Sequence, residues 1–113
     1  MEITVEKAND IAVIAMPVAE LDAANTAEFK RDMAPVLDTY AKVVFDLTKL
    51  RFIDSSGLGA FLSCLRKLTE KRGDLKLCAV SKQVRTAFAL VRMHRILDIY
   101  DTREEATRAF QPR

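Results

Sequence analysis

Two adjacent serines, Ser55 and Ser56, stand where an apolar run ends and an amphipathic pattern begins. The apolar run covers residues 43–47 and is typical of a strand. The following pattern predicts a helix, because apolar residues recur at spacings of three and four: Leu58, Phe61, Leu62, Leu65 and Leu68. The first turn of a helix has free N–H groups and a positive dipole end, which stabilise a phosphate. The serines therefore predict a modifiable docking site.

Catalysis by these serines would need further groups. A serine nucleophile needs a base within hydrogen-bond reach, and the only histidine, His94, lies far along the sequence. The serines lack the Gly-x-Ser-x-Gly elbow. Gly57 and Gly59 do not begin a dinucleotide loop, because Leu62 replaces the third glycine, and no phosphate-binding Gly-Lys-Ser/Thr loop occurs. The sequence therefore favours a protein that is not an enzyme and uses no cofactor. A small serine hydrolase is the alternative from another class.

The same residues also fit purely structural roles. Aspartate and serine are preferred N-caps, so Asp54, Ser55 and Ser56 could serve only to begin the helix. Gly57 and Gly59 could serve only to let helix and strand pack closely. From the residues alone, capping is the simpler interpretation, and it is compatible with docking.

Composition limits the class of protein. A chain of 113 residues, half of them apolar, predicts one domain over residues 1–113 with an ordinary core. Cys64 and Cys78 lie in apolar patterns, which predicts free, buried thiols and a cytoplasmic location. The sequence shows no metal-ligand cluster, base-stacking platform for nucleic acid, membrane span or signal peptide.

Charge is unevenly distributed along the chain. The formal net charge is +2, but residues 1–54 carry 6 basic and 10 acidic side chains, whereas residues 55–113 carry 12 basic and 6 acidic ones. A basic second half can face an acidic partner, although solvated helix faces are the simpler interpretation.

The first half of the chain predicts a hairpin and a helix. Strands are expected at residues 2–5 and 11–18, joined by a turn at residues 8–10 and paired antiparallel. A helix is expected at residues 22–38, with Asn25 and Glu28 as a capping box. Pro35 should kink or end this helix.

The second half predicts alternating strands and helices. Strands are expected at residues 42–47, 75–80 and 96–100. The helix at 55–72 should end at Gly73, and Ser81 should cap a helix whose inward residues are Val84, Ala87, Phe88 and Val91. Thr102 and Glu105 should open a terminal helix in which Ala106 and Phe110 share a side. The order β-β-α-β-α-β-α-β-α indicates an α/β fold. Its mixed, mostly parallel sheet has an N-terminal antiparallel edge strand and packed helices.

The motif around the serines resembles that of a known family. Residues 47–59, which include Asp54-Ser55-Ser56-Gly57-Leu58, resemble the signature of anti-sigma factor antagonists, small bacterial members of the STAS superfamily. The triplet Glu20-Leu21-Asp22 resembles their second short motif. The order of elements agrees along the whole chain, so the resemblance predicts a single STAS domain over residues 1–113.

The resemblance implies a phosphoprotein that regulates transcription by partner switching. In that family, the unphosphorylated antagonist binds an anti-sigma factor that is also a serine kinase, and this frees a sigma factor. Phosphorylation of the serine after the aspartate releases the antagonist, and a metal-dependent serine phosphatase resets it. That serine corresponds to Ser55 here. The partner-binding residues carried over are Asp22, Asp54, Ser55, Ser56, Gly57 and Leu58.

One position departs from the family pattern. Ala19 stands where the family places glycine, and a non-glycine residue resists positive φ. Within the same fold, an alternative function is a STAS regulatory subunit of a transporter or signalling complex.

Overall fold

The computed structural model describes residues 1–111, so the last two residues of the predicted 1–113 domain lie outside it. The strands are β1 (Val5–Ala8), β2 (Ile11–Ala15), β3 (Glu20–Leu21), β4 (Lys42–Asp46), β5 (Phe52–Ile53), β6 (Asp74–Cys78) and β7 (Asp98–Tyr100). The helices are α1 (Thr26–Thr39), α2 (Ser55–Glu70), α3 (Lys82–Leu90), the 3₁₀ helix η1 (Met93–Arg95) and α4 (Arg103–Arg108).

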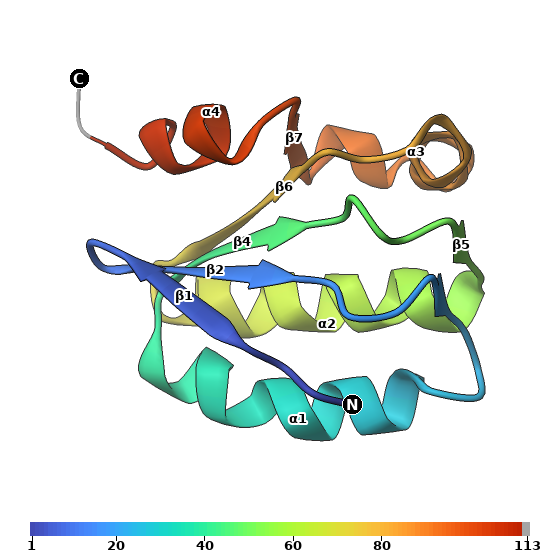
Figure 1. The fold of residues 1–113 in the computed structure, drawn as a ribbon, viewed down its shortest axis with the longest axis horizontal. Helices are drawn as coiled ribbons and strands as arrows, with labels where there is room; N and C mark the ends of the chain where they lie inside the picture. Colours follow the sequence, from blue (N-terminus) through green and yellow to red (C-terminus); the bar gives the residue numbers. More distant parts are fainter. Residues whose placement is uncertain (112–113) are drawn as a thin grey trace.

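Five strands form the main sheet in the order β1-β2-β4-β6-β7. β1 pairs antiparallel with β2, and all other neighbours pair parallel. The predicted fold class is therefore confirmed: the sheet is mixed and mostly parallel, and its antiparallel strand lies at the N-terminal edge (Figure 1).

Helices cover both faces of this sheet. α1 and α2 lie together against one face, and α4 lies on the opposite side (Figure 1). The larger core lies under α1 and α2 and contains the ring cluster Phe29, Phe45, Phe61 and Phe88. A smaller cluster lies under α4 and comprises Ile11, Val13, Val44, Cys78 and Ala106. Phe110 packs against this cluster, which confirms the prediction that Ala106 and Phe110 lie on the same side.

The hairpin is shifted from its predicted position. The first strand lies three residues later than expected, because Ala8 pairs with Ile11 and leaves only Asn9 and Asp10 in the turn. Asn9 has φ 56°, which suits the left-handed conformation of a two-residue hairpin turn. The second strand ends at Ala15 instead of residue 18.

Pro35 was expected to kink or end α1, but the helix does not end there. The helix continues to Thr39 and starts at Thr26 instead of residue 22. A proline removes a single backbone donor, and the exposed Pro35 still accepts a hydrogen bond at its carbonyl from Thr39 Oγ1 at 2.8 Å. The burial of Phe29, Met33, Val36 and Leu37 holds the helix on both sides of it.

The end of α2 differs from the prediction that Gly73 caps it. Arg72, not Gly73, takes the left-handed conformation, with φ 63°. The N–H of Gly73 donates to Leu68 O at 2.7 Å and that of Arg72 to Thr69 O at 3.1 Å, which is a Schellman ending. Glycine is required at 73 for space, since a Cβ there would lie 1.9 Å from the carbonyl oxygen of Ala41.

Three further boundaries differ. β6 ends at Cys78 because Ala79 has φ 56°. α3 ends at Leu90, so Val91 is 53% exposed and does not face inward as predicted. β7 begins at Asp98 instead of residue 96, because the N–H groups of Ile96 and Leu97 both donate to Met93 O at the end of η1. The predicted caps of α3 and α4 are confirmed: Ser81 Oγ accepts from Val84 N at 3.2 Å, and Thr102 Oγ1 accepts from Glu105 N at 3.1 Å.

Candidate docking site at the start of helix α2

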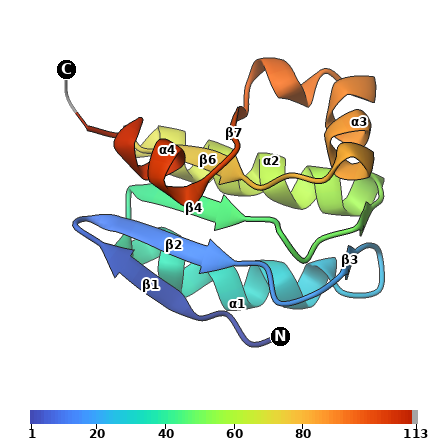
Figure 2. The ribbon, with the colours of Figure 1, turned by 45° about the horizontal axis from the view of Figure 1, so that its top comes forward.

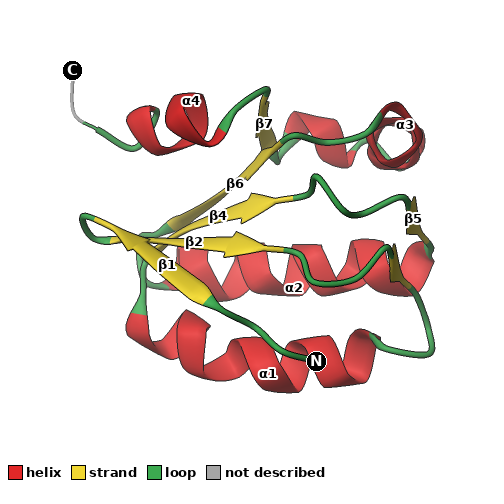
Figure 3. Ribbon diagram, viewed as in Figure 1, coloured by secondary structure: helices red, strands yellow, loops and turns green. Residues whose placement is uncertain are grey.

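A second, two-stranded sheet lies beyond the main sheet and was not predicted. β3 and β5 pair parallel, with Glu20 opposite Phe52 and Leu21 opposite Ile53, and appear as the two short strands near the start of α2 (Figure 3). Backbone bonds extend the pairing: Arg51 N donates to Ala19 O at 2.7 Å, and Asp54 N donates to Leu21 O at 3.3 Å. This small sheet brings the Glu20-Leu21-Asp22 segment against the serine motif (Figure 2).

Ala19 fits this arrangement without strain. Its carbonyl oxygen accepts the N–H groups of Arg51 and Phe52. Within residues 1–111, Ala19 is not among the non-glycine residues with positive φ, which are Asn9, Arg72, Ala79 and Arg92. Alanine at this position therefore adopts no backbone conformation that favours glycine.

Asp54 connects the two halves of the site. It is the N-cap of α2, and its Oδ1 accepts a hydrogen bond from Gly57 N at 3.0 Å. Its Oδ2 accepts a second hydrogen bond from Ala23 N at 3.0 Å, in the loop after β3. The predicted capping role is thus confirmed, and one carboxylate also fixes the neighbouring loop.

Asp22 and Asn25 shape that loop from within. Asp22 Oδ1 accepts a hydrogen bond from Ala24 N at 2.9 Å. Asn25 Oδ1 accepts from Asp22 N at 2.9 Å, and its Nδ2 donates to Glu20 O at 2.8 Å. The predicted capping box of Asn25 with Glu28 is therefore wrong, because the Asn25 side chain makes no cap bond and is used by the preceding loop.

The structure brings the six predicted docking residues together but exposes them unequally. Ser55, the first residue of α2, is exposed, and Asp22, Asp54 and Ser56 are half-buried. Gly57 and Leu58 are buried, with Leu58 only 8% exposed, so they support the site from beneath. Ser55 is thus the most accessible of the six.

The two glycines of the motif have different roles. A Cβ on Gly57 would lie 2.5 Å from Leu21 O and 2.6 Å from Ile53 Cγ1, so the predicted close packing is confirmed there. The same prediction is wrong for Gly59, where a Cβ would meet no atom within 4 Å. Gly59 is exposed and leaves the backbone of α2 open to a partner.

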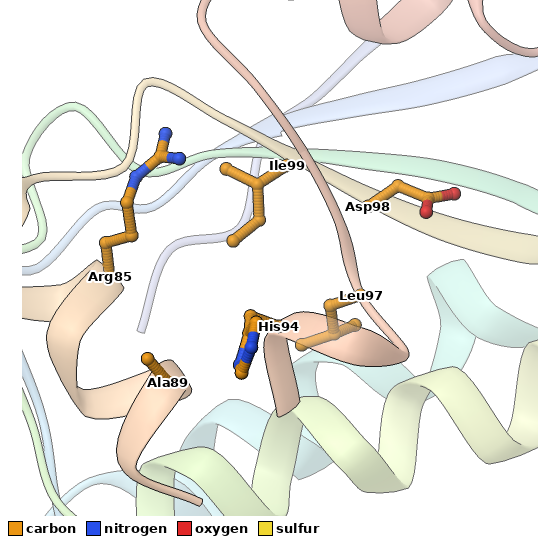
Figure 4. A pocket seen from close by; sticks show the side chains of 6 residues that line it. All are labelled: Arg85, Ala89, His94, Leu97, Asp98 and Ile99. Atoms are coloured by element: carbon orange, nitrogen blue, oxygen red, sulfur yellow. The ribbon is translucent and has the colours of Figure 1, made fainter. Parts of the chain in front are cut away.

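The histidine required by the hydrolase alternative lies in another part of the structure. His94 is in η1 and lines a pocket with Arg85, Ala89, Leu97, Asp98 and Ile99 (Figure 4). Ser55 does not line this pocket. Ser55 and His94 therefore do not share this pocket.

Both cysteines are buried and free, as predicted. Burial raises the pKa of Cys64 to about 12 and that of Cys78 to about 11, which disfavours the reactive thiolate. Within residues 1–111, no group of three His, Cys, Asp or Glu side chains is arranged to bind a metal ion. No helix in this range has the length and hydropathy needed to span a membrane.

Comparison with known proteins gives concordant results. The STAS domain model matches residues 2–106. BtrV of Bordetella bronchiseptica, provisionally named an anti-sigma factor antagonist, is 30% identical over 112 residues, covering 98% of this chain and 96% of BtrV. The crystal structure of TM1081 from Thermotoga maritima, also provisionally named an anti-sigma factor antagonist, superposes with a TM-score of 0.87. It is 27% identical and covers 95% of this chain and 92% of that chain.

The fold also matches SpoIIAA from Bacillus, solved in unphosphorylated and phosphorylated forms. The TM-scores are 0.70 and 0.72 at 22% identity, with at least 96% of each chain covered. At this identity the likeness concerns the fold alone. Because the family model spans nearly the whole described chain, the chain belongs to the STAS domain family.

Proposed function

We propose that this chain is an anti-sigma factor antagonist controlled by phosphorylation of Ser55. The unphosphorylated form binds an anti-sigma factor with serine-kinase activity and thereby frees a sigma factor. The kinase phosphorylates Ser55, the complex dissociates, and a metal-dependent serine phosphatase restores the unphosphorylated form. The chain acts in the cytoplasm as substrate and binding partner, not as an enzyme. The observation that carries this proposal is the exposure of Ser55 at the first position of α2, directly after a fully engaged N-cap.

The position of Ser55 suits a reversible dianion. A phosphate adds about −1.5 to −2 charges at neutral pH. The positive N-terminal end of α2 stabilises part of this charge within the chain itself. Asp54 is already committed to two backbone N–H groups, so it need not move when Ser55 is modified. Phosphorylation should therefore leave the fold unchanged.

Binding responds differently, because a partner must cover the same end of α2. Burying a dianion next to Asp54 against a surface without matching cations has a large desolvation cost. A cost of ~3 kcal/mol weakens binding more than a hundredfold. The switch therefore acts on association and not on folding.

The docking surface comprises the exposed groups around Ser55. Ala23 and Ala24 are exposed on the loop after β3, and Gly59 is exposed one turn along α2. None of these residues has a side chain larger than a methyl group, so a partner can approach the backbone closely. Asp22 and Ser56 border this surface and are half-buried.

The relatives support this proposal. BtrV and TM1081 are provisionally named anti-sigma factor antagonists. SpoIIAA, which shares the fold, exists in unphosphorylated and phosphorylated forms.

The proposal is tested by incubating the chain with candidate anti-sigma kinases and ATP, followed by mass spectrometry to locate the phosphate. We expect phosphate on Ser55, none on the Ser55→Ala variant, and normal phosphorylation of the control Ser63→Ala on the same helix. Kinase binding should persist in Ser55→Ala and fall more than a hundredfold in Ser55→Asp. Equal binding of Ser55→Ala and Ser55→Asp would contradict the switch.

A further inference from the structure

Four large apolar side chains remain exposed within residues 1–111, and two of them, Phe52 and Leu90, lie together. Phe52, Leu90, Val91 and Ile96 are 51%, 80%, 53% and 52% exposed. Phe52 belongs to β5, Leu90 and Val91 lie at the end of α3, and Ile96 follows η1. β5 and α3 pack side by side at one end of the molecule (Figure 1). Exposed apolar groups concentrated in this way indicate an interaction surface.

Phe52 and Leu90 line one groove. Its volume is about 440 Å³, and we name it the Phe52–Leu90 groove after these two residues; the others that line it are Arg51, Ile53, Gln83, Thr86 and Ala87. The α3 residues Gln83, Thr86, Ala87 and Leu90 follow helical spacing along one wall. From Gln83 to Leu90 this wall is about 10 Å long, which matches about two turns of a bound helix.

Among the residues that line the groove, the one charged side chain is basic, that of Arg51. The residues that line it belong to two stretches, 51–53 and 83–90, which contain no Asp or Glu. The nearest carboxylates along the chain and across the small sheet are Asp54, which follows Ile53, and the exposed Glu20, which lies opposite Phe52. The exposed cations within these stretches or within two residues of them along the chain are Lys49, Arg51, Lys82, Arg85 and Arg92. Within residues 1–111, Arg85 is the one member of this set with an ion pair, to Asp101 at 4.0 Å. Cations therefore outnumber carboxylates near the groove, which favours an acidic partner.

We propose that the Phe52–Leu90 groove binds an acidic amphipathic segment of a partner protein. Large apolar side chains of that segment enter the groove, and its carboxylates meet the surrounding arginines and lysines. A second copy of this chain is a poor occupant, because the same cations would face each other. The groove is concave, which suits inserted side chains better than the flat surface of a bilayer. This proposal does not depend on phosphorylation of Ser55.

The experiment uses two synthetic helical peptides of about 18 residues. Both carry leucines on one face, and the opposite face carries glutamates in one peptide and lysines in the other. Each peptide is titrated into the ¹⁵N-labelled chain and followed by NMR. We expect the acidic peptide to shift the amides of Phe52, Ile53, Thr86, Ala87 and Leu90, with affinity falling as salt rises. The basic peptide should bind at least tenfold more weakly.

Variants then separate the apolar and charged contributions. Phe52→Ser and Leu90→Gln change exposed side chains, so the fold should persist while the affinity for the acidic peptide falls at least tenfold. Arg51→Glu should weaken binding similarly, and the matched charge reversal Lys30→Glu, on exposed α1 surface, should not. Ser55→Asp should keep at least part of the affinity.

Three outcomes would overturn the proposal. The first is equal binding of the acidic and basic peptides, and the second is amide shifts that map away from the groove. The third is failure of the acidic peptide to bind while vesicles of phosphatidylserine and phosphatidylcholine shift the same amides, which would assign this surface to a membrane.

Discussion

The carboxylate of Asp54 accepts a hydrogen bond from the backbone N–H of Ala23 at 3.0 Å, which ties the loop after β3 to the first turn of α2. The other oxygen of Asp54 accepts the N–H of Gly57, also at 3.0 Å. Two segments about thirty residues apart therefore share one side chain, and the orientation of Ser55 relative to the loop depends on it.

Removal of this carboxylate should destabilise the chain. An N-cap contributes about 1 kcal/mol and a further hydrogen bond about as much, so Asp54→Ala should lower the free energy of unfolding by about 1–3 kcal/mol. Urea denaturation measures this loss. Ser81→Ala removes only the N-cap of α3 and should cost about 1 kcal/mol. Only Asp54→Ala should accelerate hydrogen exchange at the amide of Ala23. Unchanged exchange there would contradict the hydrogen bond between Ala23 N–H and Asp54.

Alanine substitutions at Gly57 and Gly59 should change the stability of the fold in opposite directions. Gly57→Ala places a methyl group against the carbonyl of Leu21, a backbone atom that cannot move aside easily, and should destabilise by about 1–3 kcal/mol. Gly59→Ala meets open space and should stabilise α2 by about 0.5–1 kcal/mol through helix propensity. Thermal unfolding of the two variants distinguishes them, and the same sign for both would contradict the geometry.

Regular elements could be predicted where burial imposes a clear period. The helix from Ser55 follows from its leucines and Phe61, and β4 follows from its continuous apolar run, because both faces of the sheet are covered. The ends of helices and strands were harder to predict, because they depend on backbone conformations that the residue type does not indicate. Arg72 and Ala79 take positive φ, although neither residue type favours it.

The serine motif could be located from sequence, but the geometry around it could not. β3 and β5 have two residues each, too few to show a period, and they pair across a long separation in sequence. Asn25 has the sequence spacing of a capping box. In the structure its side chain instead hydrogen-bonds to the backbone of Glu20 and Asp22, in the loop before α1. Ala23 contributes only its backbone N–H, which no side-chain pattern reveals.

Mimicry of phosphate at Ser55 should spare the fold. An acidic residue in the first turn gains about 0.3–1 kcal/mol from the helix dipole, and repulsion from Asp54 offsets part of this. Ser55→Asp should therefore leave the free energy of unfolding within about 0.5 kcal/mol of wild type. Ser55→Lys should be the less stable of the two at low salt, and the difference should shrink at high salt. Loss of about 2 kcal/mol or more in Ser55→Asp would mean that release reflects unfolding.

The Asp46 carboxylate, only 12% exposed, should govern part of the acid stability. Burial opposes its ionisation, but hydrogen bonds from Thr48 and from Arg103 Nε at 2.6 Å lower its pKa below 3.8. A folded pKa below the unfolded one means that the ionised form stabilises the fold above about pH 4. This stability is lost as pH falls through the folded pKa.

Urea titrations at neutral pH and near pH 3 test this effect. Asp46→Asn cannot lose the ionic contribution on acidification, so the stability difference between wild type and Asp46→Asn should be larger at neutral pH than at pH 3. The control Asp38→Asn removes an exposed carboxylate of α1 and is measured in the same way. A difference that is independent of pH would show that Arg103 and Thr48 do not favour the ionised form.

Cys64 and Cys78 lie in the two different apolar clusters of the fold. Because burial raises the pKa of Cys64 to about 12 and that of Cys78 to about 11, neither should react readily with a thiol reagent at neutral pH while the chain is folded. Cys64 lies in the larger core, whereas Cys78 lies in the small cluster beneath the six-residue α4. Local opening of α4 needs less free energy than global unfolding, so Cys78 should become accessible first.

Single-cysteine variants make this order measurable. With Ellman's reagent, the Cys64→Ala variant, which retains Cys78, should react faster than Cys78→Ala, and both should react at least a hundredfold faster in denaturant. Low urea should accelerate the reaction of Cys64 more steeply, because exposing it requires global unfolding and therefore more surface. Equal rates and equal urea dependence would show that α4 opens only with the whole fold, which would make the small cluster part of one cooperative unit.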